Sequence, residues 1–256
     1  DDGYMNSSLD HSDATTQIKG EEDGDRFGSV VENVGDVTGD GRDDLVVCAP
    51  ENFVAAGTPR GRCWLFSNPV SEATEDDPSA TDIDWASFSH DVSTDEFGQH
   101  PDSIAGGDFM GTSTNEIAFG LPGTNTVLIF DGVAGGGSFE PADAAVVITG
   151  SGALGRSISG STDLDGDGTD DLLVGAPATS TGSLFFLPYD SIISDLVVPG
   201  AESASWHSSG TGDGAGFSFS GLGDFDEDGS AEFAIAAPKS DTAASDAGQV
   251  WILPAY

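Results

Sequence analysis

Positive charge is scarce in this chain. Lys and Arg together number 7 among 256 residues, whereas Asp and Glu number 45, which gives a formal net charge of −38. A surface this negative repels nucleic-acid backbones and anionic lipid head groups. We therefore expect no nucleic-acid partner. The excess of acid indicates solubility, or adaptation to a saline medium; the alternative is attraction of cationic or metal-bridged partners.

Long apolar runs are also absent. No stretch reaches the roughly 18 consecutive apolar residues of a membrane-spanning helix, so no membrane insertion is expected. The chain begins at Asp1 without a signal-like segment, which fits a processed secreted product or an expressed fragment. Its four histidines form no His-x-x-x-His or His-Glu-x-x-His pattern, and no Gly-x-Ser-x-Gly motif occurs. The sequence therefore predicts no enzyme, and no catalytic or organic-cofactor site.

Cysteine is limited to Cys48 and Cys63. They lie near the end of one expected strand and the start of the next, and facing positions in adjacent antiparallel strands satisfy disulfide geometry. We predict a disulfide here, the alternative being two small buried thiols. Closing a loop of about 15 residues contributes roughly 3 kcal/mol in the chain-entropy model.

Acidic loops of nine residues, in contrast, recur. Three copies carry oxygen-bearing side chains at positions 1, 3, 5 and 9 and a glycine at position 6, and the backbone carbonyl of position 7 is available. A hard cation such as calcium needs such ligands. Asp-Gly pairs also form turns without metal, but three copies in register favour calcium. The predicted ligands are Asp36, Thr38, Asp40, Arg42 (carbonyl) and Asp44; Asp163, Asp165, Asp167, Thr169 and Asp171; and Asp224, Asp226, Asp228, Ser230 and Glu232.

A fourth, degenerate loop runs from Asp108 to Glu116. Met110 occupies position 3 and Thr112 position 5, so we expect this second loop to bind calcium weakly or not at all. The four loops start at residues 36, 108, 163 and 224, with spacings of 72, 55 and 61 residues. Periods of this length, built of short strands, are typical of β-propeller blades.

The repeat extends to both sides of each loop. A Phe-Gly pair or its counterpart precedes the loop, and an apolar strand that ends at proline follows it. The pairs are Phe27-Gly28, Phe97-Gly98, Leu154-Gly155 and Ala215-Gly216, and the strand ends are Val47–Pro50, Phe119–Pro122, Val174–Pro177 and Ile235–Pro238.

These residues resemble the FG-GAP repeats of the integrin α-subunit β-propeller and its bacterial relatives. The resemblance covers the chain from about residue 14 to residue 253. It implies four-stranded blades with calcium on the hairpin between the first two strands, hence about three Ca²⁺. The departure at Met110 and Thr112 withholds that assignment from the second loop.

The predicted fold is all-β, a β-propeller of four-stranded antiparallel blades in a single domain, 1–256. Its four units cover approximately 25–88, 95–149, 152–198 and 213–256, and their outer strands are expected at 83–88, 144–148 and 192–198. The last unit lacks such a run, so residues 14–19 are predicted to supply its outer strand and close the ring. Integrin-like propellers have seven blades, so membership of a larger ring is the alternative.

The resemblance implies an extracellular, secreted or cell-surface, calcium-stabilised binding or adhesion module that is not an enzyme. Its partner would be a protein or glycan ligand at the cell surface, or further copies of itself. Calcium loops of modest affinity suit the millimolar calcium outside cells. Two alternatives stay open: a structural building block of a surface layer, sheath or appendage, and an accessory domain of a secreted hydrolase. Fold resemblance alone does not separate these roles.

Overall fold

The computed structural model describes residues 14, 17–20, 23–51, 61–67, 84–90, 95–112, 114–133, 136–192, 194–200, 204–223, 225–227 and 232–254. Within these ranges the chain is all-β, as predicted, with short 3₁₀ segments at Pro101–Ser103 (η2), Pro141–Asp143 (η4) and Tyr189–Ser191 (η5). No helix in the described part of the chain is long and apolar enough to cross a membrane.

The strands form four sheets in chain order, and three of them have a four-stranded antiparallel core. The first contains β1 (Val30–Gly35), β2 (Asp44–Ala49), β3 (Arg62–Phe66) and β4 (Asp84–Ser89); the second β5 (Ile104–Gly107), β6 (Glu116–Leu121), β7 (Thr126–Phe130) and β9 (Val146–Thr149); the third β10 (Ser157–Thr162), β11 (Asp171–Ala176), β12 (Ser183–Leu187) and β14 (Ala204–His207); and the fourth β15 (Ser218–Gly223), β16 (Glu232–Ala237) and β17 (Gln249–Pro254). Two short strands join in parallel: β8 (Gly137–Phe139) beside β4, and β13 (Leu196–Val197) beside β9.

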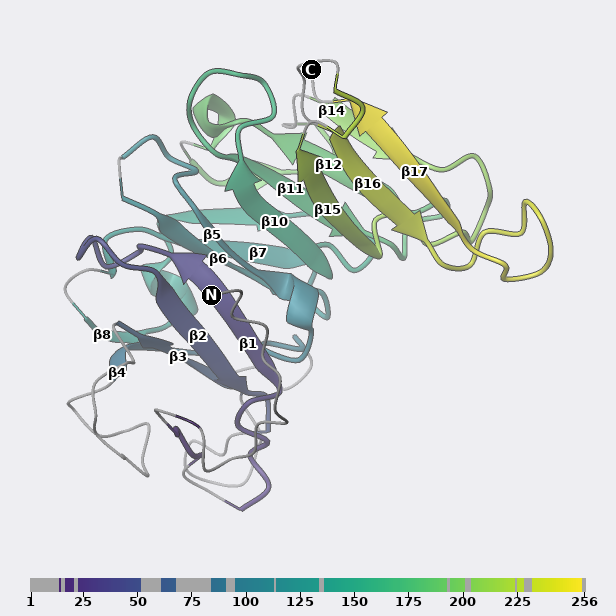
Figure 1. The fold of residues 1–256 in the computed structure, drawn as a ribbon. Coiled ribbons are helices and arrows are strands. Elements are labelled where there is room, and N and C mark those ends of the chain that lie inside the picture. The colour runs from purple at the N-terminus through teal and green to yellow at the C-terminus, as the bar shows by residue number, and fades with distance from the viewer. Residues whose placement is uncertain are drawn as a thin grey trace, which may run out of the picture.

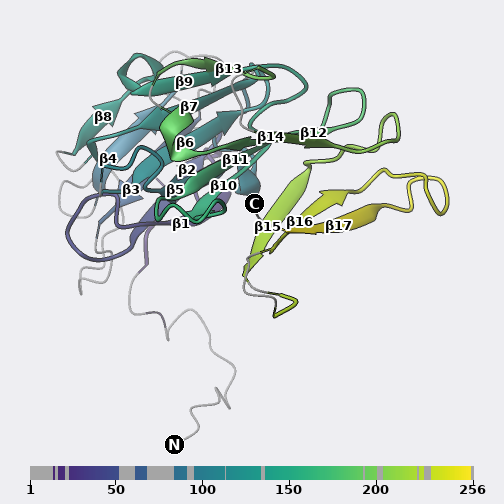
Figure 2. The same cartoon turned by 90° about the horizontal axis from the view of Figure 1, so that it is seen from above.

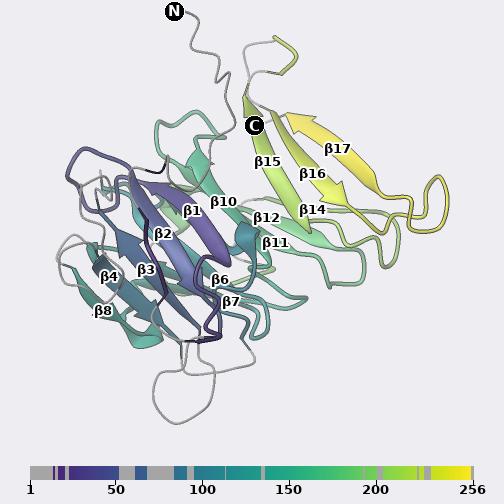
Figure 3. The ribbon, with the colours of Figure 1, turned by 60° about the horizontal axis from the view of Figure 1, so that its bottom comes forward.

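The four sheets are arranged like the blades of a fan (Figure 1). Their first strands follow one another, since β1 contacts β5, β5 contacts β10, and β10 contacts β15. Views from above and from below show the fourth sheet at one end of the series and the first sheet toward the other (Figures 2 and 3). The arrangement is propeller-like, but no strand of the first sheet pairs with a strand of the fourth among the described residues. The expected closed ring is therefore not seen in them.

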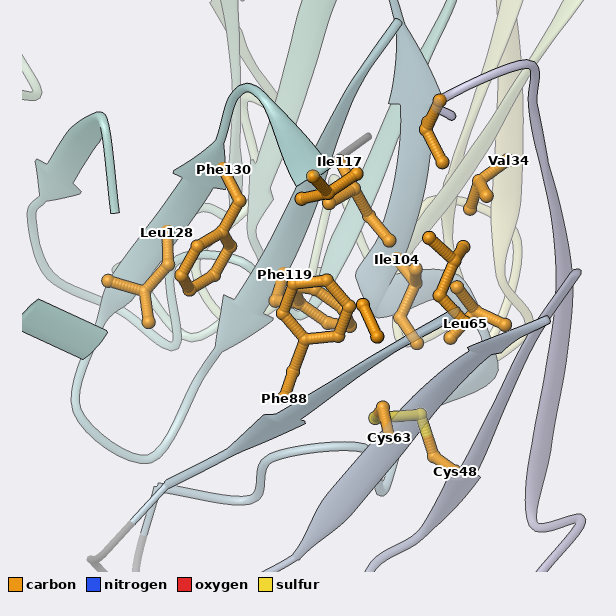
Figure 4. Packing of buried hydrophobic residues seen from close by; sticks show 14 of the residues in the cluster. Val34, Cys48, Cys63, Leu65, Phe88, Ile104, Ile117, Phe119, Leu128 and Phe130 are labelled. Atoms are coloured by element: carbon orange, nitrogen blue, oxygen red, sulfur yellow. A yellow bond between two sulfur atoms is a disulfide. The ribbon is translucent and has the colours of Figure 1, made fainter. Parts of the chain in front are cut away.

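Apolar side chains fill the spaces between neighbouring sheets. Successive residues of a strand point to opposite faces, so each inner sheet supplies two cores. Aromatic residues dominate the core between the first and second sheets, where Phe88, Phe119 and Phe130 meet (Figure 4). Cores between the later pairs of sheets include Val127, Ile148, Val174 and Phe185, and then Leu173, Leu184, Phe233 and Ile235.

The repeated glycines explain how closely the sheets approach. Gly155 has φ +82°, and a β-carbon placed on it would lie 2.9 Å from the Cα of Gly120 in the preceding sheet. Gly216 repeats this contact one sheet later, 3.4 Å from the Cα of Gly175. In the third and fourth units, the glycine before the first strand thus packs on the backbone of the strand that ends at proline in the preceding sheet. The glycine before the loop in one unit and the strand that ends at proline in the preceding unit thus form one packing contact.

The predicted disulfide is confirmed. Cys48 and Cys63 face each other across β2 and β3, and both are fully buried. Their Cα atoms are 4.0 Å apart.

Two of the expected outer strands are confirmed, since 83–88 contains most of β4 and 144–148 overlaps β9. The expectation for 192–198 is wrong. Ile192 and Val198 are buried in the core between the second and third sheets, which holds β13 beside β9. The outer strand of the third sheet is instead β14, which pairs with β12 and brings Trp206 against Trp251.

The N-terminal prediction also needs correction. Of residues 14–19, the described residues 17–19 form no strand, and Ile18 packs against a cluster that contains Trp64 and Phe66 of the first sheet. These aromatic side chains lie on the opposite face from the core shared with the second sheet, and they need an apolar cover there. Thr15 and Thr16 lie outside the described residues. In the described structure β17 is an outer edge of the fourth sheet.

Candidate metal centres

All four acidic loops occupy the same place in the fold. Each joins the first two strands of its sheet, as predicted. Loop position 9 is in every case the first residue of the second strand, and its carboxylate is buried. These residues are Asp44, Glu116, Asp171 and Glu232, with exposed fractions of 1%, 0%, 1% and 4%.

One oxygen of each buried carboxylate holds the loop closed. It accepts a hydrogen bond from a backbone N–H at loop position 2 or 3, at 2.7 to 3.0 Å: Val37 to Asp44, Met110 to Glu116, Leu164 to Asp171 and Phe225 to Glu232. The second oxygen remains for another partner. The four loops differ in the hydrogen-bond partner of this second oxygen.

In the third loop this second oxygen is buried without a partner. Asp171 Oδ1 accepts no hydrogen bond from the described residues. Asp163, Asp165 and Asp171 each place a carboxylate oxygen within 4.8 Å of the others. Burial, with Asp165 and Asp167 nearby, raises the pKa of Asp171 to about 7. An orphaned oxygen in a converging carboxylate cluster fits a hard divalent cation, which would neutralise the repulsion.

Backbone N–H groups already orient the other acids of this loop. Asp163 accepts hydrogen bonds from Gly166 at 2.7 Å and Gly168 at 2.9 Å, and Asp167 accepts one from Thr169 at 2.9 Å. The loop backbone therefore curls around the carboxylates. Thr169, the predicted carbonyl ligand, lies on this curl.

The first loop has closely matching geometry. Asp36 accepts hydrogen bonds from the N–H groups of Asp40 at 2.9 Å and Gly41 at 2.8 Å, and Asp40 accepts one from Arg42 at 2.9 Å. The second oxygen of Asp44 has only a long contact, 3.4 Å, to the Thr38 hydroxyl. Burial raises the pKa of Asp44, against the hydrogen bonds that lower it. These ligands fit the same kind of cation.

The fourth loop is described in part. Glu232 Oε2 accepts hydrogen bonds from Phe225 at 2.7 Å and Asp226 at 3.4 Å, while its buried Oε1 has no partner in the described residues. The predicted ligands Asp224, Asp228 and Ser230 lie outside those residues. The orphaned oxygen is the same signal as in the third loop.

Comparison with known proteins agrees with this repeated architecture. The FG-GAP repeat family matches residues 154–187 and 215–253, which cover three of the four core strands of the third sheet and nearly all of the fourth sheet. Mouse (Mus musculus) integrin alpha-IIb is 32% identical over 181 residues, which cover 66% of this chain and 16% of the integrin. Integrin alpha-3 of Cricetulus griseus is 30% identical over 165 residues, covering 62% and 15% respectively. The chain therefore contains FG-GAP repeats and is similar to integrin α subunits over about two thirds of its length.

The similarity concerns a limited part of the integrins, since the chain spans about one sixth of the length of the relatives it matches. The two FG-GAP repeats matched by the family are the units whose position-9 oxygen is orphaned. The first unit keeps the same loop geometry outside the matched ranges.

In the second unit, the buried carboxylate at loop position 9 has hydrogen-bond partners for both of its oxygens. The Thr112 hydroxyl donates to Glu116 Oε1 at 2.7 Å, so both oxygens of Glu116 have protein partners. Burial raises the pKa of Glu116 to about 7. The register shift that precedes the loop in the other three hairpins is absent between β5 and β6. From the sequence, Thr112 at position 5 was interpreted only as a missing ligand. Its hydrogen bond to the retained acid at position 9, Glu116, was not predicted.

Neighbouring FG-GAP loops touch each other. The Asp108 N–H of the second loop donates to Asp170 of the third at 3.1 Å, and Asn115 donates to the Val34 carbonyl of the first sheet at 3.4 Å. Burial, with Asp108 and Asp163 nearby, raises the pKa of Asp170. The first three loops thus form a connected acidic rim rather than isolated hairpins.

Proposed function

We propose that this FG-GAP repeat chain is an extracellular, calcium-stabilised, non-enzymatic binding or adhesion module. The observation that carries the proposal is the repeated buried carboxylate at loop position 9, with an unpartnered oxygen in the third and fourth loops. Buried polar atoms in folded proteins usually have a hydrogen-bond partner, so a carboxylate oxygen left without one at the same loop position in two repeats points to a further ligand such as a metal ion. Integrin relatives support a binding role for the propeller-like scaffold.

The three complete loops would each hold one Ca²⁺, about three in all. Side chains at positions 1, 3, 5 and 9 and the carbonyl at position 7 would bind it: Asp36, Thr38, Asp40, Arg42 and Asp44; Asp163, Asp165, Asp167, Thr169 and Asp171; and Asp224, Asp226, Asp228, Ser230 and Glu232. The ion supplies positive charge to carboxylates that otherwise repel one another. The protein part is already arranged, because backbone N–H groups orient Asp36, Asp163 and the position-9 acids.

The buried disulfide supports an oxidising, extracellular location, where such bonds persist. Millimolar extracellular calcium is sufficient for loops of moderate affinity. A protein or glycan ligand at the cell surface is the proposed partner. The four sheets are proposed as consecutive blades of one domain, 1–256, with the third unit extended to include β14.

The test is calorimetric calcium titration of chelator-stripped protein, with thermal melting in parallel. We expect about three sites and a higher melting temperature with calcium. Asp171→Asn should remove one site, whereas Glu116→Gln is the matched control that should keep all of them. No calcium binding, or binding without a thermal response, would reject the proposal.

A further inference from the structure

The outer edge of the fourth sheet differs from that of the other three. In each of those sheets the third strand pairs with an antiparallel outer strand: β4, β9 or β14. The equivalent strand here is β17, and no strand of the described residues pairs with its outer side. An extended strand with unpaired backbone groups is a template for another strand.

The chemistry of this edge does not discourage pairing. Gln249–Pro254 contains no charged side chain, although 20% of the residues in the chain are charged. Val250 and Ile252 are 63% and 50% exposed. Proteins usually protect an edge with lysine, internal proline or a short strand. Here the only such feature is Pro254 at the end of a six-residue strand.

A cavity accompanies the free edge. It has a volume of about 100 Å³ and lies between the third and fourth sheets, where Leu184, Ala204 and Trp206 face Leu253 and Pro254. The Trp206 and Trp251 rings, 4.7 Å apart, show that Trp251 points toward β14. A strand added beside β17 would therefore lie over β14. Because directly opposed residues share a face, its residue opposite Trp251 would point into the cavity.

The charges around β17 indicate which kind of partner strand would be attracted to this edge. β17 is neutral, but the turn before it carries exposed Asp241 and Asp246, and exposed Glu227 lies in the loop before β16, near its first residue. That first residue, Glu232, lies opposite Pro254. Both ends of the edge are therefore acidic, on a chain of net charge −38. Basic residues flanking an apolar strand would be attracted, whereas a second copy of this chain would be repelled.

We propose that the β17 edge binds an extended peptide segment of a partner protein, antiparallel to β17. The segment carries apolar side chains at alternate positions, which enter the cavity beside Trp206, and Lys or Arg at its ends. This inference deepens the proposed binding role and rests on it.

The probe is a rhodamine-labelled peptide, Lys-Thr-Ile-Thr-Ile-Thr-Lys, followed by fluorescence anisotropy with the full calcium-treated chain. We expect one-to-one binding that weakens as salt is added, because the attraction is partly electrostatic. A peptide with proline at the central position loses a backbone donor, and one with glutamate at both ends is repelled. Each should bind about tenfold or more weakly, equivalent to 1.4 kcal/mol or more.

Two variants of the protein localise the binding. Ile252→Lys adds charge on the exposed side of β17, and Ala204→Phe fills the cavity from β14. Both should weaken peptide binding about tenfold. Val31→Lys is the matched control, because Val31 is a similarly exposed strand residue, at 56%, on the first sheet. Melting curves check that each variant is folded, and the peptide should slow hydrogen exchange of those β17 amides that point away from β16.

Three results would overturn the inference. They are no binding of the peptide, unchanged peptide binding by both the Ile252→Lys and the Ala204→Phe variants, and equal affinity for the parent peptide and the proline peptide. Protection, in the free monomer, of those β17 amides that point away from β16 would mean that the chain itself covers the edge. A sedimenting dimer that excludes the peptide would assign the edge to a second copy. A normal calcium response without peptide binding rejects only this inference, whereas a missing calcium response rejects the proposed function.

Discussion

The second loop offers a direct way to test the assignment of the other three. The triple substitution Met110→Asp, Thr112→Asp and Ser113→Gly gives it the side chains and the glycine that the complete loops have at positions 3, 5 and 6. At position 6 the complete first and third loops have Gly41 and Gly168, with φ of +86° and +96°. Asp108 and Glu116 already supply positions 1 and 9. We expect a new calcium site.

Two opposing terms set the size of the effect. Without calcium, the variant loses the 2.7 Å hydrogen bond from Thr112 to buried Glu116, which costs about 1–3 kcal/mol, and it adds carboxylate repulsion. With calcium at 100 times its dissociation constant, the new site contributes about 2.7 kcal/mol. Calcium should therefore bring stability back to roughly that of the parent chain. For a domain of this size, the calcium-dependent difference is about 5–10 °C in melting temperature.

The assay is calorimetric titration with parallel melting of the triple variant, the parent and Thr112→Val. The triple variant should bind one more calcium ion than the parent. Thr112→Val loses the hydroxyl without gaining a ligand, so it should be destabilised equally with and without calcium. An unchanged calcium stoichiometry in a folded triple variant would refute the idea that Met110 and Thr112 are what prevents binding.

Three further results are expected. The raised pKa of Glu116, about 7, means that the folded state holds its proton more tightly than the unfolded state, so calcium-saturated protein should lose stability as pH rises from about 4.5 to 7, and Glu116→Gln should flatten this dependence in denaturant titrations. Reducing the Cys48–Cys63 bond should cost about 3 kcal/mol in unfolding free energy, with Cys48→Ala/Cys63→Ala insensitive to reductant. Gly155→Ala should lower the melting temperature far more than Gly166→Ala, because only Gly155 approaches a neighbouring sheet, although both have positive φ.

The features that the sequence predicted correctly are local. The loops join consecutive strands because turn residues and apolar runs alternate over short distances. The disulfide joins residues that one hairpin places opposite each other. The features that were missed are non-local. The run 192–198, which contains β13, has the stronger apolar signal, but its burial between the second and third sheets and the contact of Trp206 with Trp251 make β14 the outer strand of the third sheet. The hydrogen bond from Thr112 to Glu116 likewise depends on how the loop closes in three dimensions.

The two halves of the repeat lie at opposite ends of the first strand of each sheet, and this placement divides the stabilising interactions. Glycine contacts such as Gly155 on Gly120 stand before the strand and are uncharged packing contacts between sheets, which do not depend on cations. The acidic loops stand after the strand, and contacts such as Asp108 with Asp170 connect adjacent loops. Removing calcium should therefore loosen the loop end first, while the glycine end and the apolar cores keep the sheets together. The chain would respond to calcium by a graded stiffening of the loop rim, and only the second loop, already closed by Thr112, would stay unchanged.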